Sequence, residues 1–484
     1  KRQIQKMLAK EPTDRFSRAR MLVDALEAAI PKGLVVDASG GGTHRSVIEA
    51  VAAAPPGARI IVRPGTYAGP VVLSGTIGLV AEGPRDQVII EGTGTCAVEV
   101  TGGRPKVSSL TLRVVEAGTG SVPALRISGG RPTIMNCNAS STMGHGIDVV
   151  GARANPSVTA CVVHDCKEYG IWVREKARGT FERCEVDGDS SFGIAVSDRS
   201  DPVVRDCAFR VGGGLSGIMV HSQGKGTFER CEVDGGSFFG IVVRDRSDPV
   251  VRDCAFRVEA TGISVGSQGK GTFERCEVAG NANAGITVSD GGDPVVRECT
   301  FRDGLPAGIF VHTQGKGTFE RCEVAGNADV GIGVSEGGDP VVRDCAIRDG
   351  QFGILVYTQG NGTFERCEVA GNANAGITVS DGGDPVVREC TFRDGLPAGI
   401  FVHTQGKGTF ERCEVVSNAL AGIEVREGGD PVVRECTFRD GKASGILVHT
   451  QGKGTFERCE VVGNAYAGIE VRDGGDPAVR DCTF

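Results

Sequence analysis

Apolar residues recur along this chain in short alternating runs rather than at the 3.6-residue spacing of helices. Each run reads Gly-Ile-x-Val, a polar turn, a short strand that ends before a Cys, an apolar residue two positions later, and a glycine-bearing turn. Sixteen cysteines mark this unit at steps of 22 to 24 residues, from Cys137 to Cys482. Side chains alternate across a strand, so the apolar positions of each run share one face. The pattern predicts short strands that bury these faces in a common core.

A strand that recurs about every 23 residues without a helix of its own can pair only with its copy one coil away. That pairing is parallel, and strand twist together with the handedness of parallel crossovers favours right-handed winding. We therefore predict an all-β fold, a right-handed parallel β-helix solenoid, with repeats over residues 93–484 and a cap with the first coils over residues 33–92. In one coil the expected inward positions are Val204, Cys207, Phe209, Ile218 and Val220, with the alternation interrupted before the cysteine.

Two outward columns carry charges that alternate from coil to coil. Two residues before each Cys the column reads Glu182, Arg205, Glu229 and Arg252, and one residue before it the order inverts to Arg183, Asp206, Arg230 and Asp253. Opposite charges that face each other across strands contribute roughly 0.2–1 kcal/mol a pair, whereas like charges repel. We predict that this alternation sets the register and explains why the string GTFERCEV recurs only on every second coil.

The cysteine column has two interpretations, a metal or disulfide framework and a row of small buried side chains. The spacing follows the coil rather than the C-x-x-C pairs of metal sites, and neighbouring Cβ atoms at about 4.8 Å lie beyond disulfide reach. We favour the buried row and expect no metal and no cofactor. A reduced thiol column is typical of the cytoplasm, which we predict as the location.

The formal charge of −8 is spread in mixed-sign runs, so we expect neither nucleic acid nor a membrane as a partner. No apolar stretch approaches the ~20 residues of a membrane span. The chain starts at Lys1 and ends at Phe484 within a repeat, which favours a piece of a longer protein.

Residues 34–92 contain VVDASGGG, SVIEAVAAAPPGA and IIVRPGTY, and they resemble the capping start of pectin lyase-like and pectinesterase-like β-helices. Ser46 and Glu49 have capping-box spacing at the head of a short helix. The resemblance implies the scaffold only, since the catalytic motifs of pectinesterases, polygalacturonases and alginate epimerases are not matched. The apolar side expected to close the end of the rod consists of Val47, Ile48 and Val51.

Residues 1–30 resemble the last two helices of bacterial serine/threonine protein kinases. The matching positions of the Leu-Ala-Lys-x-Pro-x-x-Arg loop are Leu8, Ala9, Lys10, Pro12 and Arg15. The resemblance implies that residues 1–32 end a kinase domain and that the parent protein is a serine/threonine kinase. The glycine-rich loop, HRD and DFG elements are absent from the sequence, so we predict that this fragment cannot transfer phosphate.

One outward row departs from charge pairing and is the candidate binding stripe. It consists of two residues on every second coil, the residue at position x of Gly-Ile-x-Val and the residue that follows the Val. In pectin lyase-like relatives the outer face of this strand carries the sugar-binding groove, so the resemblance implies a polysaccharide or protein ligand. The alternative is that intervening Ser, Thr and Glu residues reduce the row to ordinary surface side chains. Its members are Met219, His221, Phe310, His312, Leu355, Tyr357, Phe401, His403, Leu447 and His449.

Residues 280–324 and 371–415 are identical, and a duplicated surface does not suit an active site, which needs a unique cluster of groups. We therefore assign no catalytic residue, and we interpret the pectin hydrolase-like string Gly144-His145-Gly146 as chance. The favoured function is a sensor or docking region that binds a ligand. The alternatives are a carbohydrate-active enzyme, a lyase, hydrolase or epimerase acting on a polyuronate, and a purely structural spacer.

Overall fold

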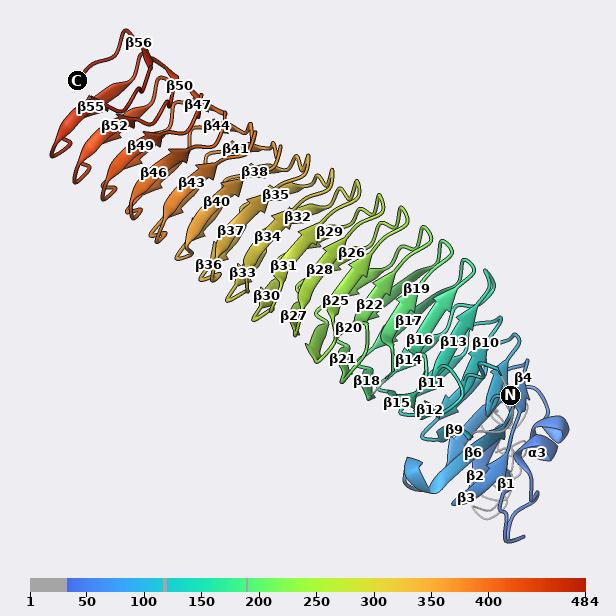
Figure 1. Cartoon of the computed structure of the whole chain (residues 1–484). Helices are drawn as coiled ribbons and strands as arrows, with labels where there is room; N and C mark the ends of the chain where they lie inside the picture. Colours follow the sequence, from blue (N-terminus) through green and yellow to red (C-terminus); the bar gives the residue numbers. More distant parts are fainter. Residues whose placement is uncertain (1–32, 116–119, 189) are drawn as a thin grey trace, which may run out of the picture.

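The computed structural model describes residues 33–115, 120–188 and 190–484, which form an elongated rod of stacked coils (Figure 1). The kinase-like residues 1–32 lie outside the described part of the chain. Three parallel sheets run the length of the rod. Sheet A begins with β1 (Leu34–Val36) and β2 (Arg59–Val62), sheet B with β3 (Gly65–Ala68) and sheet C with β4 (Val71–Leu73).

Each strand pairs in parallel with the strand of the same sheet one coil later, for example β17 (Arg178–Glu182) with β20 (Asp201–Arg205). One full coil continues from β20 through β21 (Ala208–Val211) in sheet B and β22 (Ser216–Val220) in sheet C. The same succession repeats to β56 (Ala478–Arg480). The predicted all-β, right-handed parallel β-helix is confirmed.

Sheet C carries the surface considered below, and its strands face the viewer in Figure 1. They are β4, β7 (Val98–Val100), β10 (Leu125–Ile127), β13 (Ile147–Val150), β16 (Tyr169–Arg174), β19 (Phe192–Val196), β22, β25 (Phe239–Val243), β28 (Thr261–Val265), β31 (Ala284–Val288), β34 (Ala307–Val311), β37 (Val330–Val334), β40 (Phe352–Val356), β43 (Ala375–Val379), β46 (Ala398–Val402), β49 (Ala421–Val425), β52 (Ser444–Val448) and β55 (Ala467–Val471).

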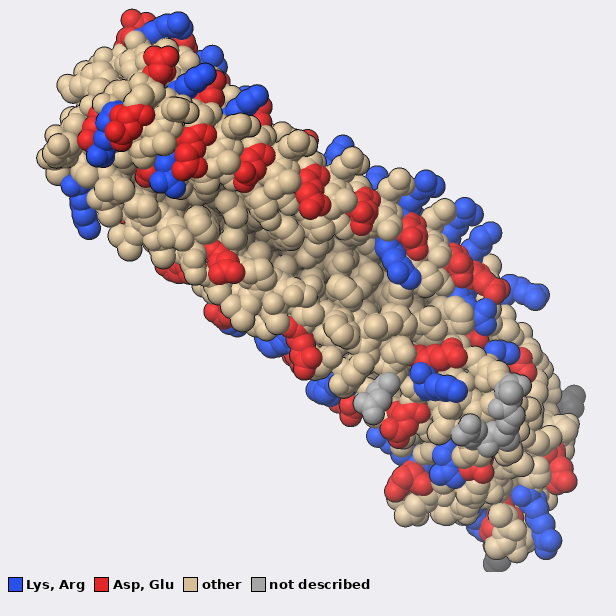
Figure 2. Space-filling model, in the orientation of Figure 1, with Lys and Arg blue, Asp and Glu red and all other residues tan. Residues whose placement is uncertain are grey.

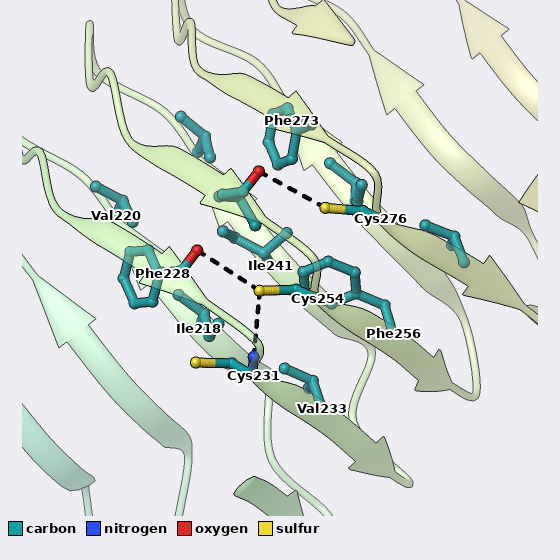
Figure 3. Close-up of a cluster of buried hydrophobic side chains, with 14 of the residues drawn as sticks. Ile218, Val220, Phe228, Cys231, Val233, Ile241, Cys254, Phe256, Phe273 and Cys276 are labelled. Carbon is teal, nitrogen blue, oxygen red and sulfur yellow. Dashed lines mark hydrogen bonds between the residues drawn. The ribbon is translucent and has the colours of Figure 1, made fainter. Parts of the chain in front are cut away.

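The core consists of columns of identical or similar side chains, one from each coil. The five inward positions predicted for the coil at 201–226 are all buried. Phenylalanine, valine and isoleucine rows surround the thiols, as Figure 3 shows for the coils around Cys231 and Cys254. The alternation breaks before each Cys because the preceding residue takes a left-handed conformation, with φ of 52° at Asp206. That residue turns the chain from sheet A into sheet B.

The charged columns pair as predicted. The Arg205 guanidinium lies 2.7 Å from Glu229 on the next coil and 3.9 Å from Glu182 on the previous one. The inverted column pairs Arg230 with Asp206 at 2.7 Å. All of these side chains are partly exposed, so each ion pair alone contributes little to the stability of the fold. The alternation acts mainly by fixing the register between neighbouring coils along the rod.

The end of the rod is closed by helix α3 (Val47–Ala53), whose N-cap is Ser46, as predicted. The Ser46 side chain accepts a hydrogen bond from the backbone N–H of Glu49 at 3.5 Å. Val47 is fully buried, whereas Ile48 is 42% exposed. The prediction that Ile48 belongs to the buried side was wrong, because the helical turn places Ala50 rather than Ile48 against the core.

The thiols form a buried ladder and no disulfide. The Cys254 thiol accepts from the backbone N–H of Cys231 at 3.4 Å and donates to the Phe228 carbonyl at 3.7 Å (Figure 3). Among the 18 cysteines only Cys96 and Cys482 are partly exposed.

We expect a thiol reagent at pH 8 to modify about two cysteines in the native protein and the others only after unfolding. Burial raises the pKa of Cys166 to about 12 and that of Cys459 to about 11, so these thiols stay protonated and unreactive. The measurement is a colorimetric thiol titration before and after denaturant. Rapid reaction of most thiols in the folded protein would contradict the ladder.

Candidate functional site

The candidate site is the outer face of sheet C. Figure 2 shows that the middle of this face is hollowed and largely free of charged groups, while charged side chains follow its margins. A groove of about 930 Å³ runs along one margin, and its lining includes four carboxylates, Glu175, Asp198, Asp245 and Asp290, and three cations, Lys176, Arg199 and Arg246. Two groups of rings lie on the face itself, one toward each end of the rod.

Toward the C-terminal end, the structure brings two pairs of rings of the candidate stripe together. The Phe310 and His312 rings stack with centroids 4.7 Å apart, and the Phe401 and His403 rings stack at 4.4 Å. The Arg426 guanidinium lies over the Phe401 ring at 4.8 Å. Burial lowers the pKa of His403, so this ring is uncharged at neutral pH.

The remaining stripe residues divide into two kinds. Leu355, Tyr357, His221 and His449 are half-buried, whereas Met219 and Leu447 are only 5% and 3% exposed. Met219 and Leu447 were predicted to project from the surface as exposed groups, and this was wrong because neighbouring coils cover them. Leu447 packs with Ala398, Ala421 and Phe401 in an apolar cluster outside the main core.

A carboxylate interrupts this apolar cluster. Glu424 aligns with Phe401 and Leu447 in the strand register and is only 6% exposed. It lies 3.1 Å from Nε2 of His449 and 3.8 Å from the Arg426 guanidinium. The outward row at this end therefore alternates apolar and charged groups that contact one another.

Toward the N-terminal end lies a group of rings that sequence reasoning missed, the aromatic cluster of His145, Tyr169, Trp172 and Phe192. The Tyr169 ring stacks on Trp172 at 5.0 Å and on Phe192 at 5.1 Å, and His145 lies 4.9 Å from Trp172. The register pairs Tyr169 with Phe192 and Ile147 with Ile171. His145 thus occupies the same slot as the Tyr169 and Phe192 rings.

A buried ion pair lies next to the aromatic cluster. Asp148 is fully buried and accepts hydrogen bonds from Arg174 at 3.0 Å and Arg126 at 3.3 Å. The Arg174 guanidinium also lies over the Trp172 ring at 4.4 Å. Asp148 thus pairs with two guanidinium groups and holds Arg174 beside the Trp172 ring.

His145 is 3% exposed, and burial lowers its pKa, so the ring is neutral at pH 7. The Ser121 hydroxyl donates to Glu168 at 3.1 Å, and the Ser121 oxygen lies 3.2 Å from Nε2 of His145. Nδ1 is buried, has no hydrogen-bond partner, and lies 3.6 Å from Glu168.

This arrangement is suited to binding. The half-buried Tyr169, Trp172 and Phe192 rings offer apolar faces on which a ligand with apolar faces of its own can pack. Within residues 33–115, 120–188 and 190–484 no cluster of three or more His, Cys, Asp or Glu side chains could hold a metal ion. Over the same residues no helix is long and apolar enough to cross a membrane.

Solved structures similar to this chain are distant β-helical proteins. Pre-mature gene product 12 of bacteriophage phi29 is 13% identical, with 96% of this chain and 75% of that chain covered and a TM-score of 0.48. The periplasmic alginate epimerase AlgG is 11% identical, with 90% and 82% covered and a TM-score of 0.25. A pectin methylesterase from carrot is 16% identical, with 50% and 82% covered and a TM-score of 0.31.

The family model described as right handed beta helix region matches residues 96–256, 211–342, 239–392 and 383–484. These matches overlap and together span all of the regular coils. With the coil period, the parallel register and the three sheets in agreement, the chain belongs to the right-handed β-helix family.

Proposed function

We propose that this chain binds a linear polysaccharide along the outer face of sheet C and does not itself catalyse a reaction. The observation that carries the proposal is the row of half-buried, mutually stacked Tyr169, Trp172 and Phe192 rings on this face. A sugar ring has an apolar face of C–H groups that packs on aromatic rings, and its hydroxyls donate to acceptors at the edge.

The ring pairs at the other end of the face support a polymeric ligand. The stacked pairs of Phe310 with His312 and Phe401 with His403 belong to the two identical segments, so the same surface occurs twice along the rod. A uniform face of this kind suits a repeating ligand better than a single small molecule.

Two alternatives are less well supported. A carbohydrate-active enzyme needs a unique cluster of catalytic groups, whereas the segments 280–324 and 371–415 present the same surface twice. A purely structural spacer does not need aromatic rings that stack along its outer face, as Tyr169, Trp172 and Phe192 do. A binding face accounts for both observations.

The cellular setting is a further part of the proposal. The kinase-like string at residues 8–15 supports a parent protein in which a serine/threonine kinase domain precedes this binding region in the cytoplasm. The sequence encoded upstream of residue 1 tests it, because HRD and DFG elements are expected there. Their absence would leave the binding region without its proposed kinase.

We expect Trp172→Ala to weaken binding of a neutral hexasaccharide at least about tenfold, because it removes the ring on which the sugar packs. Titration calorimetry with cellohexaose and mannohexaose measures it. Tyr466→Ala is the control, since Tyr466 is 76% exposed at the far end of the rod. No binding of either hexasaccharide, or equal affinity in the Trp172→Ala and Tyr466→Ala variants, would contradict the proposal.

A further inference from the structure

Exposed large apolar side chains gather on one edge of the rod, at the turns that lead from sheet B to sheet C. Six of them lie one or two residues before a sheet C strand, and each is 46% to 76% exposed. The other exposed large apolar side chains of the described residues lie toward the two ends of the rod. The six are here named the turn row: Leu215, Phe238, Leu305, Leu396, Leu420 and Tyr466.

The turns themselves do not require apolar residues. The backbone ladder continues through polar and apolar turns alike, since the N–H groups of Asn283 and Leu420 both donate to a carbonyl of the previous coil, at 2.9 and 2.7 Å. An exposed apolar row that the fold does not need indicates a contact with another macromolecule. Coils with a polar side chain directly before the sheet C strand are those of Asn283, Asp329, Gln351 and Asn374.

The spacing of the turn row is self-complementary. The row contains two pairs on adjacent coils, Leu215 with Phe238 and Leu396 with Leu420. Leu215 and Leu420 lie nine coils apart, on the coils of β22 and β49, and Phe238 and Leu396 lie seven coils apart, on those of β25 and β46. Both separations have the same midpoint, between β34 and β37 and beside Leu305. A two-fold axis at that midpoint brings each pair against the other pair of a second copy, as in isologous dimers.

Charges beside the turn row fit the same arrangement. Asp234 and Arg393 occupy one register slot of sheet B, four residues before Phe238 and three residues before Leu396. An axis that opposes Phe238 to Leu396 therefore also opposes Asp234 to Arg393. Near the axis, Asp329 is exposed and has no ion pair among the described residues, and it faces the coil of Arg302 in the second copy.

The charge pattern also restricts the register of the pair. Sheet B strands that begin with Glu, as at Glu277 and Glu323, alternate with strands that end in Arg, as at Arg302 and Arg348. Because the opposed coils are an odd number apart, every arginine coil of one copy meets a glutamate coil of the other. A shift by one coil sets like charges together, which disfavours it.

A parallel pair lacks this match. Rotation about an axis along the rods sets sheet B of one copy against sheet C of the other, and the middle of that face is largely free of charged groups (Figure 2). The sheet B arginines then meet no row of carboxylates. The charges therefore favour the antiparallel arrangement.

We propose that two copies of this chain associate antiparallel through the turn row, about a two-fold axis between β34 and β37. In this register the rods overlap from β16 to β55, which is thirteen coil steps or roughly 60 Å at ~4.8 Å per coil. A contact strip about 13 Å wide along that length buries the ~800 Å² on each partner that a standard interface contains. The axis is perpendicular to both rods, so the two sheet C faces lie on the same side of the pair. The pairing requires no ligand on sheet C.

The test is the mass of the chain in solution, measured without sugar by sedimentation velocity at about 1–50 μM, where we expect a dimer. The row variant combines Phe238→Ser and Leu396→Ser, which meet each other twice in the pair, and should raise the dissociation constant at least about tenfold. The matched control combines Val72→Ser and Met135→Ser, both 47% exposed and away from the turn row, and should change it less than about twofold. Circular dichroism should be the same for both variants, because all four side chains are exposed.

Cross-linking tests the antiparallel register. A chain with both Leu215→Cys and Leu420→Cys should form intermolecular disulfides under a mild oxidant, because each new thiol meets the other one in the second copy. Leu215→Cys alone should not, and the unaltered chain shows the background from the partly exposed Cys96 and Cys482. A monomer over the whole concentration range, equal association of the row and control variants, or cross-linking through Leu215→Cys alone would overturn the proposal.

Discussion

Phe301→Ala and Phe392→Ala are each expected to lower the free energy of unfolding by about 3–5 kcal/mol. Both rings are fully buried in sheet B, on β33 (Thr300–Arg302) and β45 (Thr391–Arg393). Each packs against the backbone of a glycine, since a Cβ on Gly285 would lie 2.8 Å from Cδ1 of Phe301. The coils above and below are fixed by strand pairing, so the cavity left by the ring cannot collapse.

The two variants form a matched pair, because the segments 280–324 and 371–415 are identical. Urea unfolding followed by circular dichroism measures the total change, and amide hydrogen exchange shows whether the loss is local to the altered coils. Val462→Ala, which removes a side chain 48% exposed, is the control and should cost under about 1 kcal/mol. A loss below that level for either phenylalanine would show that the ring column is not the main source of stability.

The coil period, the core columns and the charge alternation could be predicted because each depends on one residue type returning at one spacing. Cys207 and Phe209 are buried for the same reason that Cys231 and Val233 are. The buried positions of one coil therefore predict the buried positions of the other coils. The asparagine column was missed although its signal is present as Gly-Asn-Ala on every second coil. Asn327 is buried and its side-chain oxygen accepts from the backbone N–H of Gly304 at 3.0 Å.

The candidate site was predicted only in part. The stacked pairs of Phe310 with His312 and Phe401 with His403 follow from their spacing of two on one strand face. The burial of Leu447 does not follow from spacing, because it depends on the side chains that the neighbouring coils place beside it. The aromatic cluster was missed because it lies in coils that depart from the regular repeat, where the register of His145 against Tyr169 is not evident from spacing.

Asp148→Ala is expected to lower the free energy of unfolding by about 2–4 kcal/mol, because it removes a buried carboxylate that two guanidinium groups share. The Arg126 and Arg174 side chains are 37% and 21% exposed, so water partly replaces the lost partner and the cost stays below that of a fully buried pair. Glu91→Ala is the control. The ion pair of Glu91 with Arg113 is similar in kind but more exposed, and its loss should cost under about 1 kcal/mol.

The same variant links the ion pair to the proposed binding face. Without Asp148, Arg174 keeps only its hydrogen bond to Glu175, so the guanidinium over the Trp172 ring is less constrained and the surroundings of the ring change. Because Trp172 is the single tryptophan of the chain, its fluorescence reports the change directly. We expect an altered emission spectrum together with weaker hexasaccharide binding, whereas Glu91→Ala leaves both unchanged. Destabilisation with an unaltered spectrum and full binding would show that Asp148 serves the fold alone and that Trp172 is held by its stacking with Tyr169.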